Sequence, residues 1–212
     1  MYKTIIFDFN GTLIDDCQLC LDILNWICKE YGLGKVSMEK YMDIFTFPVY
    51  KYYAELGFDT SVESFKIIGQ KFHNYYNKLS YEQVKLFPNV KIVLESLKDK
   101  YTIVCLSASH IDTLIKQLKF YGIYDYFDFV VGLSDTYANS KEAVAIKFIK
   151  ENHLNGNETL FIGDSIHDLE VANAINADCY LLSTGHTSKK RLLNETEKVL
   201  DDIKNVLDVL NN

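Results

Sequence analysis

Arginine, proline and long apolar runs are nearly missing from this sequence of 212 residues, and each scarcity excludes a class of protein. Arg191 is the single arginine among 22 basic residues, and the formal net charge is −7. Such a chain lacks the basic face that binding to nucleic acid usually requires. No stretch approaches the roughly 20 uninterrupted apolar residues of a transmembrane helix. Charges and turn residues interrupt the first apolar run, so we expect no signal peptide and a cytoplasmic location.

Cysteine is also scarce, with five residues in the whole chain. An odd number of cysteines in a chain of this length argues against a disulfide framework. Cys17 and Cys20 form a C-x-x-C pair, but no second pair and no nearby histidine completes a zinc site. We therefore interpret both as thiols that pack on a helix. His186 has no feature that distinguishes it from a surface residue.

Short apolar runs alternate with helical patterns over most of the sequence. Because these runs are apolar on both faces, they indicate parallel strands covered by helices. The alternation predicts an α/β fold with a doubly wound, Rossmann-like parallel sheet of five strands. The predicted strands cover residues 3–8, 101–107, 127–133, 159–163 and 178–183, and the predicted helices cover 89–99, 111–121, 141–152, 166–175 and 197–210.

One long segment breaks this alternation, because residues 16–82 contain helical patterns and no convincing strand. Leu21, Leu24, Ile27 and Cys28 form an apolar stripe at helical spacing. We therefore predict a core built from residues 1–15 and 83–212, with an all-helical cap inserted at 16–82.

Polar side chains gather where the predicted strands end. Ligands bind beyond the carboxyl ends of the strands in open α/β sheets, so these side chains are the candidates for a site. In chain order they are Asp8, Asn10, Gly11, Thr12, Ser107, Ala108, Ser109, His110, Lys141, Asp164 and Asp168.

The three carboxylates in this set predict a bound cation. Carboxylates that share a site repel one another and raise one another's pKa, and a divalent cation removes that repulsion. Mg²⁺ takes few protein carboxylates and binds a substrate phosphate as well. Asp8 and Asp164 are the expected ligands, with Asp168 as a further ligand or an outer acceptor. A carboxylate oxygen of Asp8 could attack phosphorus while Ser107 and Lys141 hold the phosphoryl oxygens.

These segments together resemble the four motifs of the haloacid dehalogenase superfamily, and the resemblance covers essentially the whole chain. The motifs are DFNGTL from Asp8, CLS ending at Ser107, Lys141, and GDSIHD from Gly163 to Asp168. The helical insertion resembles the small cap of the phosphoglycolate phosphatase and β-phosphoglucomutase branch. The resemblance implies Mg²⁺, an aspartyl-phosphate on Asp8 that water later hydrolyses, and the backbone carbonyl of Asn10 as a metal ligand. It also implies a small phosphorylated metabolite as substrate, with phosphoglycolate suggested by analogy. We expect a monomer or a weak homodimer, with no nucleic acid or membrane as partner.

Several further residues are expected to contact the phosphate or the rest of the substrate. Gly11 would let backbone amides approach the phosphate closely. Phe47, beside Pro48 in the predicted cap, is an aromatic residue that we expect to face the site. The expected contacts are Gly11, Thr12, Ala108, Ser109, His110 and Phe47.

Asn10 stands where phosphatases of this superfamily usually carry an aspartate that acts as acid and base. An amide has no proton to exchange near neutral pH, and a positioned acid or base contributes roughly 10²–10⁴-fold to a rate. The protein could therefore be a slow or specialised phosphatase, with His110, Asp15 or a water in place of the acid. It could instead be a non-catalytic phosphate-binding or regulatory protein, or Asn10 could be an altered position. A dehalogenase shares the Asp nucleophile and is a further alternative.

Overall fold

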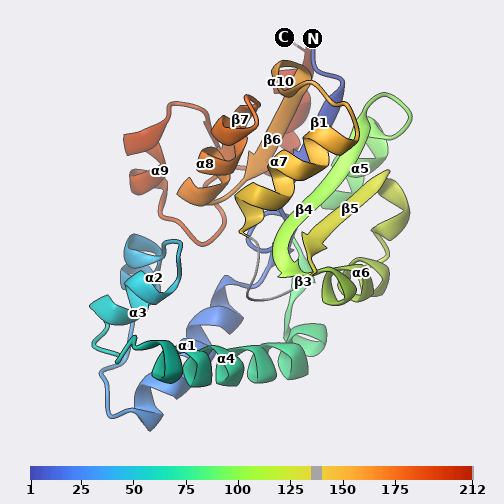
Figure 1. The fold of residues 1–212 in the computed structure, drawn as a ribbon. Coiled ribbons are helices and arrows are strands. Elements are labelled where there is room, and N and C mark those ends of the chain that lie inside the picture. The colour runs from blue at the N-terminus through green and yellow to red at the C-terminus, as the bar shows by residue number, and fades with distance from the viewer. Residues whose placement is uncertain (135–139, 212) are drawn as a thin grey trace.

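The computed structural model describes residues 1–134 and 140–211 of the chain. Its centre is a six-stranded parallel sheet in the order β5-β4-β1-β6-β7-β8, so the first strand lies in the middle (Figure 1). The strands are β1 (Thr4–Phe7), β4 (Thr102–His110), β5 (Phe129–Leu133), β6 (Thr159–Gly163), β7 (Asp178–Leu182) and β8 (Val199–Leu200).

Helices cover both faces of this sheet, which explains why its central strands are apolar throughout. Successive side chains of a strand point to opposite faces, so Ile5 and Phe7 pack on one side and Ile6 on the other. The first face packs against α5 (Val90–Leu97), α6 (Ile111–Phe120) and α10 (Val206–Asn211). The second packs against α7 (Lys141–Glu151), α8 (Ile166–Ala174) and α9 (Lys189–Glu195). The Rossmann-like fold expected from the sequence is confirmed.

A helical segment leaves the sheet at the carboxyl ends of its strands (Figure 1). It contains α1 (Cys17–Glu30), α2 (Met38–Ile44), α3 (Tyr50–Glu55) and α4 (Val62–Gln83). A small antiparallel pair of strands, β2 (Ile14–Asp15) and β3 (Lys85–Leu86), joins the segment to the rest of the chain. One hydrophobic cluster runs from the sheet into these helices without a break, so the division into a core and a cap stays a prediction.

Three local features differ from the sequence prediction. The sheet has six strands instead of five, because Val199 and Leu200 pair with the end of β7. The tail is therefore not one helix over 197–210 but β8, a 3₁₀ turn at Ile203–Asn205 and the short helix α10. The strand predicted over 101–107 continues to His110, with a register shift between Leu106 and His110. Across the described residues, no helix is long and apolar enough to cross a membrane.

Candidate active site

Asp8 immediately follows the central strand β1 and lies at the middle of the sheet's carboxyl edge. Its backbone N–H donates to Ile162 O at 2.9 Å, which fixes the chain beside β6 at this point. Gly11 then turns with φ of +74°. A Cβ on Gly11 would lie 2.5 Å from Asp164 Oδ2 and 2.6 Å from His186 Cδ2. Glycine is therefore required both by the left-handed backbone and by the close approach of Asp164.

Three carboxylates converge at this edge, as the sequence predicted. One oxygen from each of Asp8, Asp164 and Asp168 lies within 4.8 Å of the other two, and all three residues are buried. Burial, together with the neighbouring carboxylates and against the lowering effect of Lys141, raises the pKa of Asp8 to about 8. Burial and Asp168, against the lowering effect of His186, raise the pKa of Asp164 to about 6. A cluster of hard, mutually repelling oxygen donors fits a Mg²⁺ ion.

Lys141 provides the positive charge of the cluster. It is the first residue of α7, whose N-cap Ser140 accepts from Ala143 N at 3.1 Å. The buried Lys141 Nζ donates to Asp8 Oδ1 and to Asp168 Oδ1. Burial alone would lower the pKa of this lysine, but the two carboxylates raise it above its usual range. The ammonium therefore stays charged beside Asp8.

Asp168 is positioned as a support for the cluster by the start of α8. Its Oδ2 accepts from Asp164 N at 3.1 Å, from Ser165 N at 3.0 Å and from Ser165 Oγ at 2.7 Å, which closes a capping box. Its Oδ1 accepts from Lys141. Burial would raise the pKa of Asp168, but Lys141 holds it below its usual range. Asp168 therefore holds both the Lys141 ammonium and the start of α8, in addition to contributing to the carboxylate cluster.

Asn10 is held by its side-chain amide, and the contacts explain why an amide suits this position. Its Nδ2 donates to Asp16 Oδ2 and to Tyr76 OH, both at 2.8 Å. Its Oδ1 accepts from Ser109 Oγ at 3.3 Å. Asp16 is buried and also accepts from Gly11 N at 3.0 Å. An aspartate at position 10 would present a second carboxylate to Asp16 where Asn10 presents a donor.

Of the remaining predicted residues, Thr12, Ser107 and Ala108 lie at the carboxyl edge, and His110 lies apart from the three carboxylates. Thr12 Oγ1 donates to Asp164 Oδ1 at 3.0 Å, and the buried Ser107 Oγ accepts from Ser109 N at 3.1 Å, so both lie at the carboxyl edge. Ala108 follows Ser107 within β4. His110 caps α6 by accepting from Asp112 N at 3.3 Å, and no contact among the described residues joins it to the carboxylates.

The helical segment closes onto the core beside the carboxylates. Phe47 stacks on His167 of α8 with ring centroids 4.8 Å apart, and Phe45 stacks on His186 at 4.9 Å. Arg191 Nη1 donates to Met42 O at 3.0 Å and to Phe45 O at 2.6 Å. The predicted contact residue Phe47 therefore lies where the segment meets the core.

The sequence reasoning missed His186, and the expectation of a surface residue is wrong. His186 is 5% exposed, and its backbone N–H donates to Asp164 Oδ2 at 2.7 Å. Its ring lies near Cys17 and Cys20, so a histidine does approach the C-x-x-C pair. The signal that could have found it is its position: Gly185 and His186 follow β7 as Asp8 follows β1.

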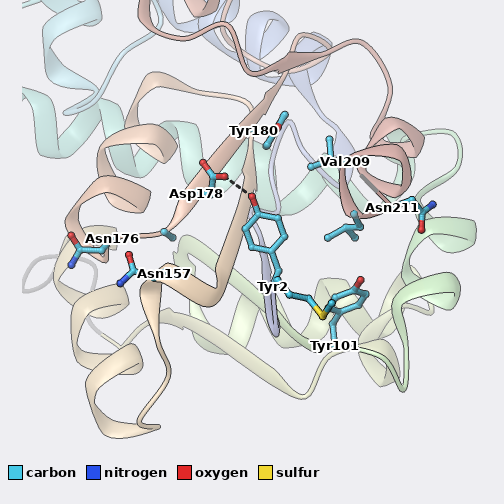
Figure 2. Close-up of a pocket in the computed structure, with 11 residues that line it drawn as sticks. Tyr2, Tyr101, Asn157, Asn176, Asp178, Tyr180, Val209 and Asn211 are labelled. Atoms are coloured by element: carbon cyan, nitrogen blue, oxygen red, sulfur yellow. Dashed lines mark hydrogen bonds between the residues drawn. The ribbon is translucent and has the colours of Figure 1, made fainter.

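A pocket at the opposite end of the sheet has a different character (Figure 2). Tyr2, Tyr101 and Asp178 line it at the starts of their strands, far along the sheet from the carboxylates. Asp178 already accepts from Tyr2 OH and pairs with Lys198. We assign this pocket no part in the chemistry at the carboxyl edge.

The chain is similar to known proteins over most of its length. Residues 5–182 match the family described as haloacid dehalogenase-like hydrolase. Phosphoglycolate phosphatase of Vibrio cholerae is 27% identical over 98% of this chain and 96% of its own length. A pyrophosphatase of Halalkalibacterium halodurans is 22% identical over 79% of this chain and 77% of its own. A haloacid dehalogenase-like hydrolase structure from Streptococcus pneumoniae superposes with a TM-score of 0.84 at 21% identity, covering 99% of this chain and 98% of that one.

Proposed function

The chain belongs to the haloacid dehalogenase-like hydrolase family, and from this membership we propose that it is a Mg²⁺-dependent phosphatase that hydrolyses a small phosphate ester through an aspartyl-phosphate on Asp8. The observation that carries the proposal is the convergence of Asp8, Asp164 and Asp168 around Lys141 Nζ at the carboxyl edge of the sheet. Relatives named phosphoglycolate phosphatase and pyrophosphatase support phosphate chemistry.

Asp8 and Asp164 would hold Mg²⁺ through carboxylate oxygens, together with the backbone carbonyl of Asn10. Bound Mg²⁺ would neutralise the carboxylates and the charge of the phosphoryl group. Lys141 and the Ser107 hydroxyl would hold the phosphoryl oxygens in line with Asp8. Asp168 would keep the Lys141 ammonium in place.

The reaction then needs two displacements at phosphorus. An oxygen of Asp8 attacks, the bond from phosphorus to the leaving oxygen breaks, and the leaving group departs with that electron pair. Water then attacks the aspartyl-phosphate, gives up a proton to solvent, and releases inorganic phosphate and the Asp8 carboxylate. Closure of the helical segment over the site would limit the water that reaches the intermediate.

Asn10 decides which esters react fast, because its amide has no proton for the leaving oxygen. Acyl phosphates, aryl phosphates and pyrophosphate have leaving groups that carry negative charge readily. The leaving group of phosphoglycolate is an alkoxide, which needs a proton. We therefore propose that phosphoglycolate-like esters are slow substrates and that esters with acidic leaving groups react faster.

The test is phosphate release, with and without Mg²⁺, from acetyl phosphate, p-nitrophenyl phosphate and phosphoglycolate. We expect Mg²⁺-dependent turnover that Asp8→Asn abolishes and that Asp125→Asn, at an exposed carboxylate, leaves unchanged. Absence of turnover in both the native chain and Asn10→Asp would instead indicate a non-catalytic phosphate-binding protein. Turnover in Asn10→Asp alone would identify Asn10 as an altered position. Halide release from a haloacid without metal would identify a dehalogenase.

A further inference from the structure

A second cluster of ligand atoms lies where α1 begins against the core. It consists of Asp16, Cys20 and His186, and we call it the Asp16 cluster. One ligand atom from each residue lies within 4.8 Å of the other two, and all three residues are buried. Asp16 precedes α1, Cys20 lies in its first turns, and His186 comes from the loop after β7. The start of α1 and the loop after β7 therefore bring an oxygen, a sulfur and a nitrogen together.

Two distances in the Asp16 cluster, each to a different oxygen of Asp16, are in the range found between neighbouring ligand atoms of a tetrahedral metal ion. His186 Nε2 lies 3.2 Å from Asp16 Oδ1, and Cys20 Sγ lies 3.7 Å from Asp16 Oδ2. Zinc binds such atoms at about 2.0–2.3 Å, which places neighbouring ligand atoms of a tetrahedron about 3.3–3.8 Å apart. Small movements of these side chains would be enough to enclose an ion.

The ligand atoms of the Asp16 cluster favour a particular metal ion. Thiolate and imidazole ligands favour Zn²⁺ over the Mg²⁺ expected at the oxygen cluster of Asp8. Burial raises the pKa of Cys20 well above its usual range, so without a metal the thiol keeps its proton and donates to Asp16. A bound Zn²⁺ replaces that proton and the proton on His186 Nε2, and both are released to solvent.

Neighbouring groups already orient the ligands. Tyr41 OH lies 2.9 Å from His186 Nδ1, the ring nitrogen that faces away from Asp16. Tyr76 OH donates to Asp16 Oδ2 at 2.7 Å. Such outer hydrogen bonds fix the rings and carboxylates of metal sites. The thiol of Cys17 interacts with the His186 ring as well.

We propose that Asp16, Cys20 and His186 form a Zn²⁺ site that joins the first helix of the helical segment to the core loop after β7. The site is separate from the Mg²⁺ cluster, although the His186 backbone and Gly11 touch both. Zinc bound there holds α1 against the core beside the candidate active site.

The test uses Co²⁺ alone as a spectroscopic probe of the metal-free full chain. We expect one equivalent of Co²⁺ to give the strong visible bands of a tetrahedral ion and a thiolate charge-transfer band, both removed by added Zn²⁺ and retained in excess Mg²⁺. Cys20→Ser and His186→Asn should weaken binding by at least about 100-fold, as loss of a ligand does. Cys28→Ser, on the same helix but outside the cluster, and Asp8→Asn, in the other cluster, should keep the spectrum.

A native chain without the tetrahedral spectrum would overturn the proposal. So would a spectrum that persists in Cys20→Ser and His186→Asn. Should those two variants fail to fold, the native chain still decides: Zn²⁺ must raise its melting temperature in the presence of saturating Mg²⁺, and an unchanged melting temperature refutes the site. None of these measurements involves turnover, so the outcome is independent of the proposed phosphatase function.

Discussion

The substitution Asn10→Asp probes the most unusual residue of the site. In the structure Asn10 Nδ2 lies 2.8 Å from Asp16 Oδ2. The substitution replaces this donor with an acceptor and brings two carboxylates together. At an effective dielectric constant of about 20, two unit charges at this distance repel by about 6 kcal/mol. The introduced carboxyl should therefore hold a proton or turn away from Asp16 toward Asp8.

A protonated carboxyl that turns toward Asp8 supplies the acid that the native chain lacks. A positioned acid contributes roughly 10²–10⁴-fold, or about 2.7–5.5 kcal/mol of the barrier, when the leaving group is a poor one. We expect kcat/KM for phosphoglycolate, which reports the phosphorylation of Asp8 and not the later hydrolysis of the intermediate, to rise by about that factor in Asn10→Asp. For acetyl phosphate, whose leaving group needs little protonation, the rise should stay below about 10-fold.

The assay is steady-state phosphate release from both substrates at saturating Mg²⁺, with Asn194→Asp as an exposed control for the same chemical change. The ratio of the two gains is the informative quantity, because it cancels differences in folding and concentration. An equal gain for both substrates, or no gain for phosphoglycolate in a folded variant, would refute the reasoning about the leaving group.

Three further predictions concern the charges and contacts around the site. Lys141→Ala leaves Asp8 and Asp168 buried without their cation, so the free energy of unfolding measured in urea without metal should fall by about 3–5 kcal/mol, while the exposed control Lys147→Ala should change it little. Mg²⁺ affinity measured by calorimetry should increase from pH 6 to pH 8, because burial raises the pKa of Asp8 and Asp164 and the ion competes with their protons; a constant affinity would contradict their role as ligands. Arg191→Ala removes two hydrogen bonds to backbone carbonyls of the helical segment, so amide exchange around α2 should accelerate, whereas Lys190→Ala should have no such effect.

The sequence predicted the central strands of the sheet well, because their signal is local. Within the predicted strands at 3–8 and 159–163, the stretches Thr4–Phe7 and Thr159–Gly163 are buried on both faces. Strand β8 has two residues, which is too short for any hydrophobic period to appear. It exists because Val199 and Leu200 pair with β7, and that partner is distant in the sequence. The extension of β4 to His110 depends on a bulge whose pairing is likewise non-local.

For the candidate site as well, some residues could be predicted from local sequence signals and others could not. Asp8, Asp164 and Asp168 could be predicted from strand ends, since parallel strands deliver their carboxyl ends to one edge. His186 follows a strand end too, but it lies more than 160 residues from Cys20 and near no other motif, so spacing in the sequence gave no reason to pair them. The partners of Asn10 were equally hidden, because Tyr76 approaches only once α4 packs against α1.

The most direct measurement of the central claim is to look for the phosphoryl group on Asp8. The chain is mixed with acetyl phosphate and Mg²⁺, quenched in acid, and its peptides are mapped by mass spectrometry. Because Asn10 cannot activate water, the intermediate should accumulate, and the peptide containing Asp8 should carry one phosphoryl group that Asp8→Asn loses. Phosphate release without any label on Asp8, or a label on another residue, would contradict the account.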